Sequence, residues 1–404
     1  MNWTSDHKIQ YLENNPMNKK VKIAYCIPSL YYPSGMERVL TLKANYFAEH
    51  LGYHIHIILT DGKGKEPYYK LYPSITTHQL DINYDELYGL SLLKRIHRYW
   101  SKQKLFKKRL ETCLNEIEPD ITISLLRRDI NFINKMKDKS IKLGEIHFNK
   151  SNYREFSDNR LPSFIQRAVK KYWMWQLIRQ VRQLKRFVVL SHEDAAEWTE
   201  LNNVTVIYNP LPFFPKQQSD NTPKQVIAVG RYVPQKGFDR LISAWSIVNK
   251  KHPDWILRIY GDGMRKQLQD QINELEISSS CILEHSTPNI VDKYCESSIF
   301  VLSSRYEGFG MVIIEAMACG VPPVSFTCPC GPRDIISDGI NGLLVENGNI
   351  EGLAEKICYL IEDENVRQKM GQQARMDIER FRIEPIAEQW KTLFESIIEK
   401  NKKL

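Results

Sequence analysis

Short apolar runs alternate with amphipathic segments along most of the chain. The first half predicts buried strands at about 21–27, 54–60, 120–126, 142–148 and 186–190. The segment 36–50 has apolar residues three and four positions apart, which predicts a helix with one buried face. Longer helices are expected at 91–117 and 163–185. Strand followed by helix, several times over, predicts a mostly parallel sheet covered on both faces.

The segment 208–223 interrupts this alternation. It carries four prolines and a polar run, YNPLPFFPKQQSDNTP, which predicts a linker. Beyond it the alternation begins again. The expected strands are 225–230, 255–261, 281–285, 298–304, 322–326 and 342–345, and the expected helices are 237–250, 263–276, 310–319 and most of the chain after 349.

A chain of 404 residues is long enough for two domains. We expect a disordered extension (1–16), an N-terminal Rossmann-like domain (17–207), the linker (208–223), a C-terminal Rossmann-like domain (224–380) and a C-terminal helix (381–404). Open α/β sheets bind ligands at the carboxyl ends of their strands. Two such domains would therefore form a cleft with the ligands between them.

Composition narrows the class of protein. The chain is 42% hydrophobic and 26% charged, which is ordinary for a globular protein. It has no run of about 18 apolar residues, and its first residues lack the apolar core of a secretory signal. Eight scattered cysteines without a C-x-x-C pair favour reduced thiols. We expect a cytoplasmic protein.

The net charge of +8 is unevenly distributed. Residues 1–200 contain 33 Lys and Arg against 22 Asp and Glu, whereas residues 201–404 contain 23 against 26. Two segments, 94–109 and 167–186, carry eight and seven cations with no acid, and several aromatic residues lie among them. These segments favour an anionic membrane surface or an anionic acceptor. Ordinary solvated amphipathic helices explain them as well.

Two cations follow the first strand of the second half. Arg231 comes directly after the run that ends at Gly230, and Lys236 precedes the next helix. Cations at a strand end, beside the unpaired amides of a helix N-terminus, are typical of a phosphate site. The alternative is a pair of solvated surface charges.

A glycine-rich turn follows the strand at 298–304. Glu307 precedes Gly308, Phe309 and Gly310, and a helix then begins near Met311. These glycines let backbone amides approach an anion closely. Glu315 lies inside the apolar helix, where a carboxylate needs a partner such as a sugar hydroxyl. The alternative is that both acids are solvated or stabilise the helix dipole.

These motifs resemble those of a known family. The run EGFGMVIIEAMACGVP (307–322) is similar to the E-x7-E signature of retaining glycosyltransferases with the GT-B fold, family 4. Companion motifs are VGRYVPQKGFD (229–239), IYGDG (259–263) and GPRDIISDGINGLLV (331–345), and PSGMERV (33–39) resembles the family's glycine loop. The resemblance implies two Rossmann-like domains, with the C-terminal helix returning to the first.

The resemblance also implies roles for residues. Arg231 and Lys236 would bind the donor diphosphate, and Gly35 would let the first-domain loop reach it. Glu315 would accept hydrogen bonds from the ribose, and Glu307 would contact the transferred sugar beside the backbone of Gly308, Phe309, Gly310 and Met311. His147, in GEIHFN, would lie near the reacting carbon; a structural histidine at a strand end is the alternative.

The predicted reaction is transfer of a hexosyl or N-acetylhexosaminyl unit from a UDP-sugar to a glycan or polyprenyl-linked acceptor, with retention, in cell-surface polysaccharide synthesis. The chain contains no D-x-D motif, so we expect no metal and no other cofactor. Cys328 and Cys330 flank a proline near the donor loop, but two cysteines alone do not form a metal site.

Other functions stay open. A UDP-sugar epimerase of GT-B shape would share the nucleotide site and need no acceptor. A protein that binds nucleic acid or another anionic surface would explain the basic helices, although no RRM, KH or zinc pattern is present. A dehydrogenase is disfavoured because no strand leads into G-x-G-x-x-G.

Overall fold

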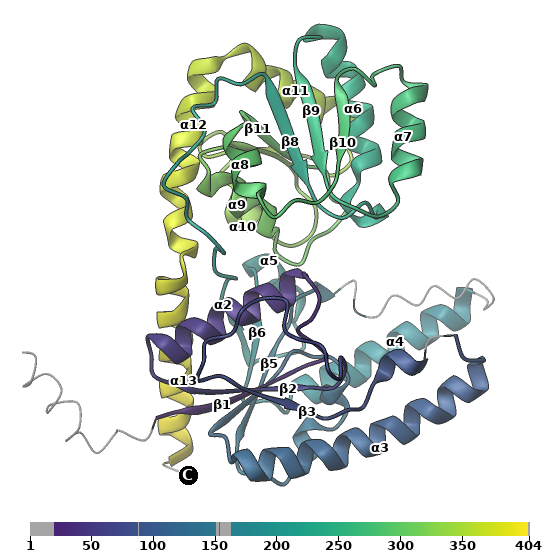
Figure 1. The fold of residues 1–404 in the computed structure, drawn as a ribbon, viewed down its shortest axis with the longest axis vertical. Coiled ribbons are helices and arrows are strands. Elements are labelled where there is room, and N and C mark those ends of the chain that lie inside the picture. The colour runs from purple at the N-terminus through teal and green to yellow at the C-terminus, as the bar shows by residue number, and fades with distance from the viewer. Residues whose placement is uncertain (1–19, 88, 151–152, 154–162, 403–404) are drawn as a thin grey trace, which may run out of the picture. The chain divides into compact units, whose positions relative to one another are not determined.

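The computed structural model describes residues 20–87, 89–150, 153 and 163–402 (Figure 1). The predicted extension 1–16 lies outside these residues. The chain divides into two compact units. Unit 1 comprises residues 1–145, 183–186 and 391–404, and unit 2 comprises residues 146–182 and 187–390. Each unit is described separately below.

The first half of the chain forms a seven-stranded sheet. Its order is β3 (Thr76–Gln79), β2 (His54–Leu59), β1 (Lys22–Ile27), β4 (Ile121–Ser124), β5 (Ile141–Glu145), β6 (Arg186–Val189) and β7 (Val204–Val206). β1 pairs in parallel with β2 and with β4, so that Cys26 lies opposite Ile58 and Ser124. The strand order therefore reverses at β1: the chain continues on one side to β2 and later on the other to β4. β1 to β5 belong to unit 1, and β7 and most of β6 belong to unit 2.

Burial in this sheet follows the sequence pattern. Residues 23–27 of β1 are all buried, as expected for a parallel strand that is covered on both faces. Helix α2 (Gly35–Glu49) buries the predicted apolar face. Lys43 is buried on the same helix, where its ammonium pairs with Glu145, which is equally buried. Burial lowers the pKa of Lys43, and the Glu145 carboxylate opposes that shift.

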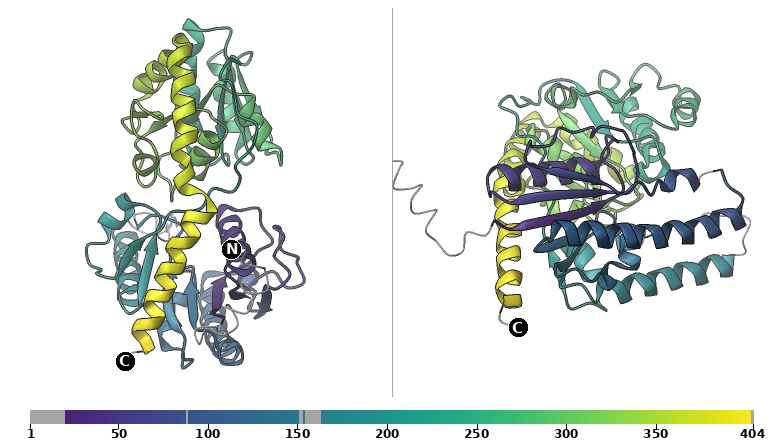
Figure 2. Two further views of the ribbon diagram at one scale, coloured as in Figure 1. Left: turned by 90° about the vertical axis from the view of Figure 1, so that its left-hand side faces the viewer. Right: turned by 60° about the horizontal axis from the view of Figure 1, so that its bottom comes forward.

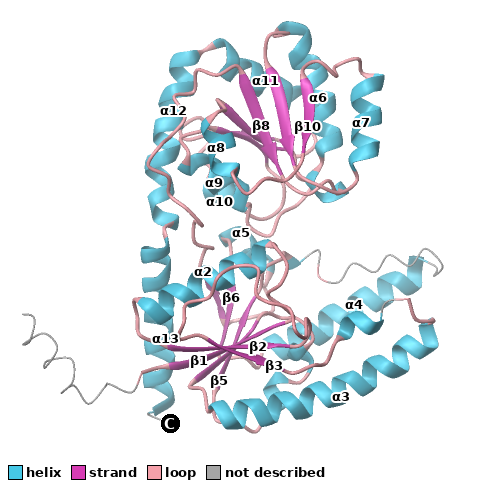
Figure 3. Ribbon diagram, in the orientation of Figure 1, coloured by secondary structure: helices cyan, strands magenta, loops and turns pink. Residues whose placement is uncertain are grey.

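Unit 2 contains a six-stranded sheet (Figure 3). Its order is β10 (Cys281–Glu284), β9 (Ile256–Tyr260), β8 (Gln225–Val229), β11 (Ile299–Leu302), β12 (Pro323–Phe326) and β13 (Leu343–Val345). Alternate residues of β8 enter two separate hydrophobic clusters: Val226 and Ala228 join one, and Ile227 and Val229 the other. The period of two in a strand thus divides the core between the two faces of the sheet.

Helices cover both of these faces. One cluster includes residues of α6 (Phe238–Lys251), α7 (Arg265–Glu274) and α11 (Ile350–Glu362). The other includes residues of α8 (Ile290–Cys295), α9 (Met311–Ala318) and α10 (Pro332–Ile335). This arrangement is the doubly covered α/β layer that the sequence predicts.

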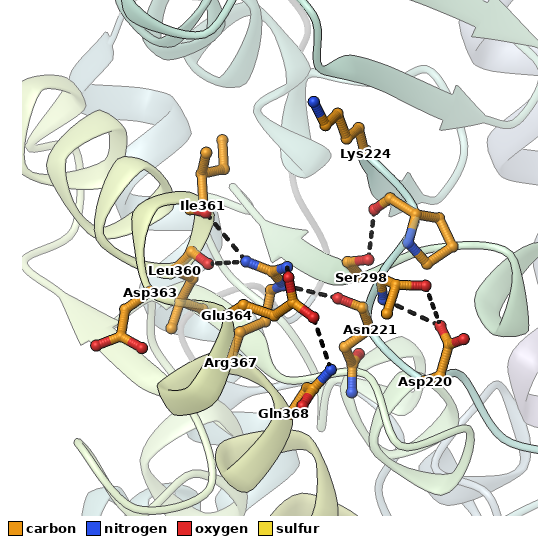
Figure 4. Close-up of polar contacts among 12 residues, drawn as sticks. Asp220, Asn221, Lys224, Ser298, Leu360, Ile361, Asp363, Glu364, Arg367 and Gln368 are labelled. Carbon is orange, nitrogen blue, oxygen red and sulfur yellow. Dashed lines mark hydrogen bonds and ion pairs between the residues drawn. The ribbon is translucent and has the colours of Figure 1, made fainter.

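The linker segment is held against unit 2. The amide of Leu211 donates to the carbonyl of Phe381 (2.6 Å), and the amide of Ser219 donates to that of Cys319 (2.8 Å). Arg367, on α12 (Glu364–Asp377), is 3% exposed and donates through Nε to the carbonyl of Asn221 (2.9 Å; Figure 4). The same guanidinium donates to the carbonyl of Leu360 (2.6 Å). Backbone carbonyls therefore satisfy this buried charge and fasten the end of the linker.

The last helix, α13 (Ile383–Lys402), continues the yellow end of the chain after α12 (Figure 2). Its residues from 391 onward belong to unit 1. There Phe394 is fully buried, and its ring centroid lies 6.0 Å from that of Phe47 and 6.2 Å from that of Tyr53. The prediction that the C-terminal helix returns to the first domain is confirmed.

Some elements differ from the predicted ones. β3 was not predicted, because its sequence TTHQ is polar and mostly exposed. The short strand β7 and helix α5 (His192–Glu197) also lack a clear pattern. β5 ends at Glu145 rather than 148, and α4 (Ser163–Val181) ends before 185. The basic helix α3 (Leu92–Ile117) matches its prediction. Within the described residues, no helix combines the length and the apolar character needed to span a bilayer.

Candidate active site

The strand order of the six-stranded sheet reverses at β8. β9 and β10 lie on one side of β8, and β11 and the later strands lie on the other. The chain leaves β8 into Gly230 and Arg231, and it leaves the adjacent β11 into Ser303 and Ser304. Loops at such a reversal diverge at the carboxyl ends of the strands, which is where open α/β sheets bind ligands.

Two glycines position Lys236 at this edge. Gly237 has φ of +62°, and a Cβ there would lie 2.2 Å from the carbonyl oxygen of Ser303. Only glycine permits both that conformation and that approach. The stem of Lys236 covers Gly230, since a Cβ at Gly230 would lie 3.2 Å from three of its carbons. Lys236 thus lies against the residue that precedes Arg231. Arg231 itself is exposed.

The ammonium of Lys236 pairs with Glu307. Nζ lies 2.7 Å from Oε1, and the two side chains are 15% and 7% exposed. Ser304 Oγ donates to the same oxygen at 2.6 Å. Among the described residues, nothing donates to the other oxygen, Oε2. An ammonium has three N–H donors, and Glu307 uses one of them. The pair therefore keeps capacity for both an anion and a hydroxyl group.

The turn that begins at Glu307 packs against the segment after β5. A Cβ at Gly308 would lie 2.7 Å from the carbonyl oxygen of His147, so only glycine fits there. Asn149 Nδ2 donates to the carbonyl of Glu307 at 3.2 Å. The amide of Glu307 donates to the carbonyl of Pro329 at 3.0 Å. These contacts, all within unit 2, bring His147 beside Glu307.

The end of the turn starts α9. Phe309 is buried, with its ring centroid 5.8 Å from that of Tyr208 and 5.7 Å from that of Phe381. Gly310 has φ of +94° and precedes Met311, the first residue of α9. The first amides of a helix have no partner within the helix, and its dipole favours an anion.

Glu315 lies in the interior of α9 and is 4% exposed. Tyr294 Oη donates to its Oε2 at 3.4 Å. This contact gives the buried carboxylate a hydrogen-bond partner from α8, so Glu315 is neither solvated nor at the helix end. The alternative that Glu315 only stabilises the helix dipole loses its support.

The structure thus brings most of the predicted residues together. Lys236 contacts Glu307, and Gly308 contacts the backbone of His147. Gly35 belongs to unit 1, where it is exposed as the first residue of α2. Its predicted contact with the donor stays a prediction, as do the catalytic and binding roles of all these residues.

The sequence did not indicate three residues that donate hydrogen bonds to Glu307 or Glu315: Ser304, Asn149 and Tyr294. Ser304 and Asn149 lie in motifs already singled out, directly after a strand and two residues after His147, so proximity to those motifs was an available signal. Tyr294 belongs to a short helix far from Glu315 in sequence, and nothing in the sequence connects the two.

The cysteines near the turn are buried thiols. Burial raises the pKa of Cys328 and of Cys330 above the ordinary thiol range. In the described part of unit 2, the donor atoms of His252, Cys358 and Glu362 lie within 4.8 Å of one another, as a metal site would require. None of these three residues belongs to the predicted donor site.

Known proteins are similar to this chain in sequence and in fold. Residues 212–377 match the family model described as glycosyl transferases group 1. This part of the chain is therefore similar to the group 1 glycosyl transferases. An uncharacterized glycosyltransferase of Haemophilus influenzae is 29% identical over 377 residues, which is 92% of this chain and 99% of that protein.

Two further matches concern Staphylococcus aureus. Its poly(ribitol-phosphate) alpha-N-acetylglucosaminyltransferase is 30% identical to this chain over 260 residues, 63% of this chain and 51% of the relative. The crystal structure of a TarM mutant in complex with fondaparinux, alpha-GlcNAc-glycerol and UDP has a TM-score of 0.72 at 18% identity. It covers 93% of this chain, and 99% of that chain is matched. This likeness shows the fold, which is GT-B.

Proposed function

We propose that this protein is a glycosyltransferase that moves a hexosyl or N-acetylhexosaminyl unit from a UDP-sugar to a glycan or lipid-linked glycan acceptor, with retention of anomeric configuration. The observation that carries the proposal is the ion pair of Lys236 with Glu307 at the reversal of the sheet. Arg231 follows the same strand as Lys236, and α9 begins four residues after Glu307. The S. aureus relative is named for transfer of N-acetylglucosamine, and the TarM complex contains UDP. Both support the donor class.

Departure of UDP places negative charge on the β-phosphate. Arg231, the two unused N–H groups of Lys236 and the first amides of α9 supply positive charge and donors for it. Each preorganised donor of this kind contributes about 3 kcal/mol to transition-state stabilisation. Glu307 Oε2 accepts a hydrogen bond from a hydroxyl of the transferred sugar, and Glu315 accepts a hydrogen bond from a ribose hydroxyl.

The acceptor hydroxyl attacks from the face that the phosphate leaves, and a phosphate oxygen takes its proton. This route gives retention without a second protein carboxylate at the reacting carbon. In this proposal His147, whose backbone carbonyl lies against Gly308, contacts the donor sugar near that carbon.

No divalent metal is required in this proposal. Fixed cations take the role that a metal held by D-x-D takes elsewhere, and the chain contains no D-x-D. Two observations support this absence of a metal: the positive charges of Arg231 and Lys236, and the lack of a D-x-D motif.

The acceptor belongs, in this proposal, to a cell-surface polysaccharide, and the protein works at the inner face of the membrane. The exposed aromatic residues of the basic helices support a peripheral contact. Trp100 on α3 is 63% exposed, and Phe164 and Trp175 on α4 are 65% and 54% exposed. Such side chains are typical of interfacial helices with nearby Lys and Arg.

A panel of nucleotide-sugars tests the proposal. The purified chain is heated with UDP-, GDP-, ADP- and dTDP-sugars, each with EDTA and with Mn²⁺. A ligand at about 100 times its Kd adds ~2.7 kcal/mol to the free energy of unfolding, so the UDP-sugars should raise Tm. EDTA should leave that shift and the rate of UDP release nearly unchanged. No shift with any UDP-sugar would contradict the donor class, and activity only with Mn²⁺ would contradict the metal-free mechanism. Conversion of the UDP-sugar without an acceptor would favour an epimerase.

A further inference from the structure

Unit 1 has a reversal of its own. β1 lies between β2 and β4, so the loops that follow β1 and β4 diverge at adjacent strand ends. The loop after β1 leads into α2, whose first turn carries Glu37. The loop after β4 leads through Arg127 to Asp129, the first residue of a short 3-10 helix (Asp129–Asn131). This is the second place in the chain where the topology predicts a ligand.

Two buried acids at this edge have unused capacity. Glu37 is 5% exposed and Asp129 is 2% exposed. In each carboxylate one oxygen, Oε2 of Glu37 and Oδ2 of Asp129, is buried with no hydrogen-bond partner among the described residues. A buried carboxylate oxygen without a donor is costly, and a ligand hydroxyl is a natural donor for it.

The guanidinium of Arg127 is close enough to both acids to act on them electrostatically. Burial raises the pKa of both, to about 6 for Asp129, and Arg127 acts on both in the opposite direction. Arg127 is exposed, and its Nη2 lies 3.7 Å from Sδ of Met36, next to Glu37. The preceding residue, Leu126, is buried at φ of +49°, a conformation that a leucine rarely adopts. Backbone strain of this kind clusters at ligand sites.

We propose that Glu37, Arg127 and Asp129 bind the acceptor, and that the acceptor carries hydroxyl groups beside a phosphate. The two free carboxylate oxygens accept hydrogen bonds from hydroxyls, and the guanidinium fork binds the phosphate. This inference rests on the proposed function, because only a transferase needs an acceptor. It adds the residues and the chemistry that select the acceptor.

The neighbouring Arg128 does not share this role. Its guanidinium lies 3.8 Å from Asp61 Oδ2 and 4.1 Å from the centre of the Tyr84 ring, so it is held within the fold. A metal ion does not explain the two acids, because the positive charge of Arg127 next to both opposes a cation.

Binding of three small probes tests the proposal. The full chain is first saturated with UDP, so that the phosphate groups of the donor site are occupied. sn-Glycerol 3-phosphate, glycerol and inorganic phosphate are then titrated and followed by ligand-observed NMR. sn-Glycerol 3-phosphate should bind about tenfold or more tightly than either other probe, because it alone engages the carboxylates and the guanidinium together. Equal binding of inorganic phosphate would overturn the proposal in favour of an anion site only.

Two variants and a matched control complete the test. Glu37→Gln, which keeps the size of the side chain, and Arg127→Ala should each weaken sn-glycerol 3-phosphate by about tenfold or more. Lys104→Ala removes an exposed cation of α3 in the same unit and should change nothing. UDP should bind all four proteins within about twofold. Wild-type binding of sn-glycerol 3-phosphate by both folded variants would overturn the inference alone, whereas failure of the wild type to bind UDP would contradict the proposed function.

Discussion

Lys236 depends on its neighbours for its position. Gly237 lets its backbone turn, Gly230 lies under its stem, and Glu307 accepts from its ammonium. The sequence indicated a cation before a helix, but two cations on a surface fit the same pattern. The ion pair with Glu307, 71 positions away, distinguishes a built site from a solvated charge.

Replacing Lys236 tests the electrostatic role directly. Lys236→Met keeps the apolar stem on Gly230 and removes the ammonium. We expect the transfer rate to fall by about 10²–10³-fold, the effect of losing one preorganised donor. Lys224→Met is the matched control. Lys224 lies directly before β8, at the opposite end of that strand from Gly230, and its ammonium pairs with Asp254 in solvent. Initial rates with UDP-sugar and acceptor give the comparison. A wild-type rate for Lys236→Met, or an equal loss for Lys224→Met, would remove the assignment.

The raised pKa of Asp129 predicts that the free energy of unfolding depends on pH. Burial raises its pKa to about 6, so between pH 4 and 6 the folded protein holds a proton that the unfolded chain has lost. Its contribution to stability is therefore fully present below pH 4 and is lost as the pH rises through 6. A pKa of about 6 in place of the ordinary value near 4 corresponds to ~3 kcal/mol.

Asp129→Asn should lose this dependence. The free energy of unfolding of the variant relative to the wild type should rise by up to ~3 kcal/mol from pH 4 to pH 7. Urea unfolding at the two pH values measures it. A difference between the two proteins that does not change with pH would show that Asp129 titrates in its ordinary range.

Strands in the two sheets end earlier than their apolar runs. Residues 146–148 and 303–304 continue the apolar or small pattern of β5 and β11, yet they leave the ladder. These are the residues that contact the Glu307 turn. Periodicity predicts which side chains are buried, but a side chain can be buried in a loop as well as in a strand. The strand ends could therefore not be placed from the pattern.

Gly237 lets the start of α6 lie against the carbonyl oxygen of Ser303, directly after β11. Gly52 serves as a comparison that separates the effect of this contact from the effect of backbone conformation. Gly237 and Gly52 have nearly the same φ, +62° and +67°, but a Cβ at Gly52 meets nothing within 4 Å. Gly52→Ala should cost about 1–2 kcal/mol for its conformation alone. Gly237→Ala should cost clearly more and lower the transfer rate, because the methyl group would push β11 and Lys236 apart. Thermal unfolding and initial rates measure both. Equal destabilisation would mean that the approach to Ser303 has no consequence.

The last helix ends in unit 1, far in sequence from Phe47 and Tyr53, which it packs against. Phe394 completes the core of unit 1, which the chain had left at residue 145 apart from a short return at 183–186. Charged residues four positions apart predicted that the chain after 349, including 381–404, is helical. The family resemblance, rather than the pattern, indicated which domain the helix covers.

The basic helices predict a salt-dependent association with membranes. The described parts of α3 and α4 carry exposed aromatic residues among many cations. Vesicles with about 30% anionic lipid should bind the protein at low salt and release most of it at ~0.5 M salt, because screening shortens the range of these charges. Trp100→Ala should weaken binding, and Tyr359→Ala, an exposed aromatic residue of α11, is the control. Binding that is absent, or that salt leaves unchanged, would contradict the peripheral location.

Most of the strands and helices, their buried faces and the motifs of the proposed donor site follow from the sequence, because periodicity and short motifs depend on neighbouring residues. The pairing of Lys236 with Glu307, the contact of Gly308 with His147 and the buried acids of unit 1 depend on residues that are distant in the chain. Only packing in three dimensions sets which of these side chains meet and which keep an unused hydrogen-bonding atom.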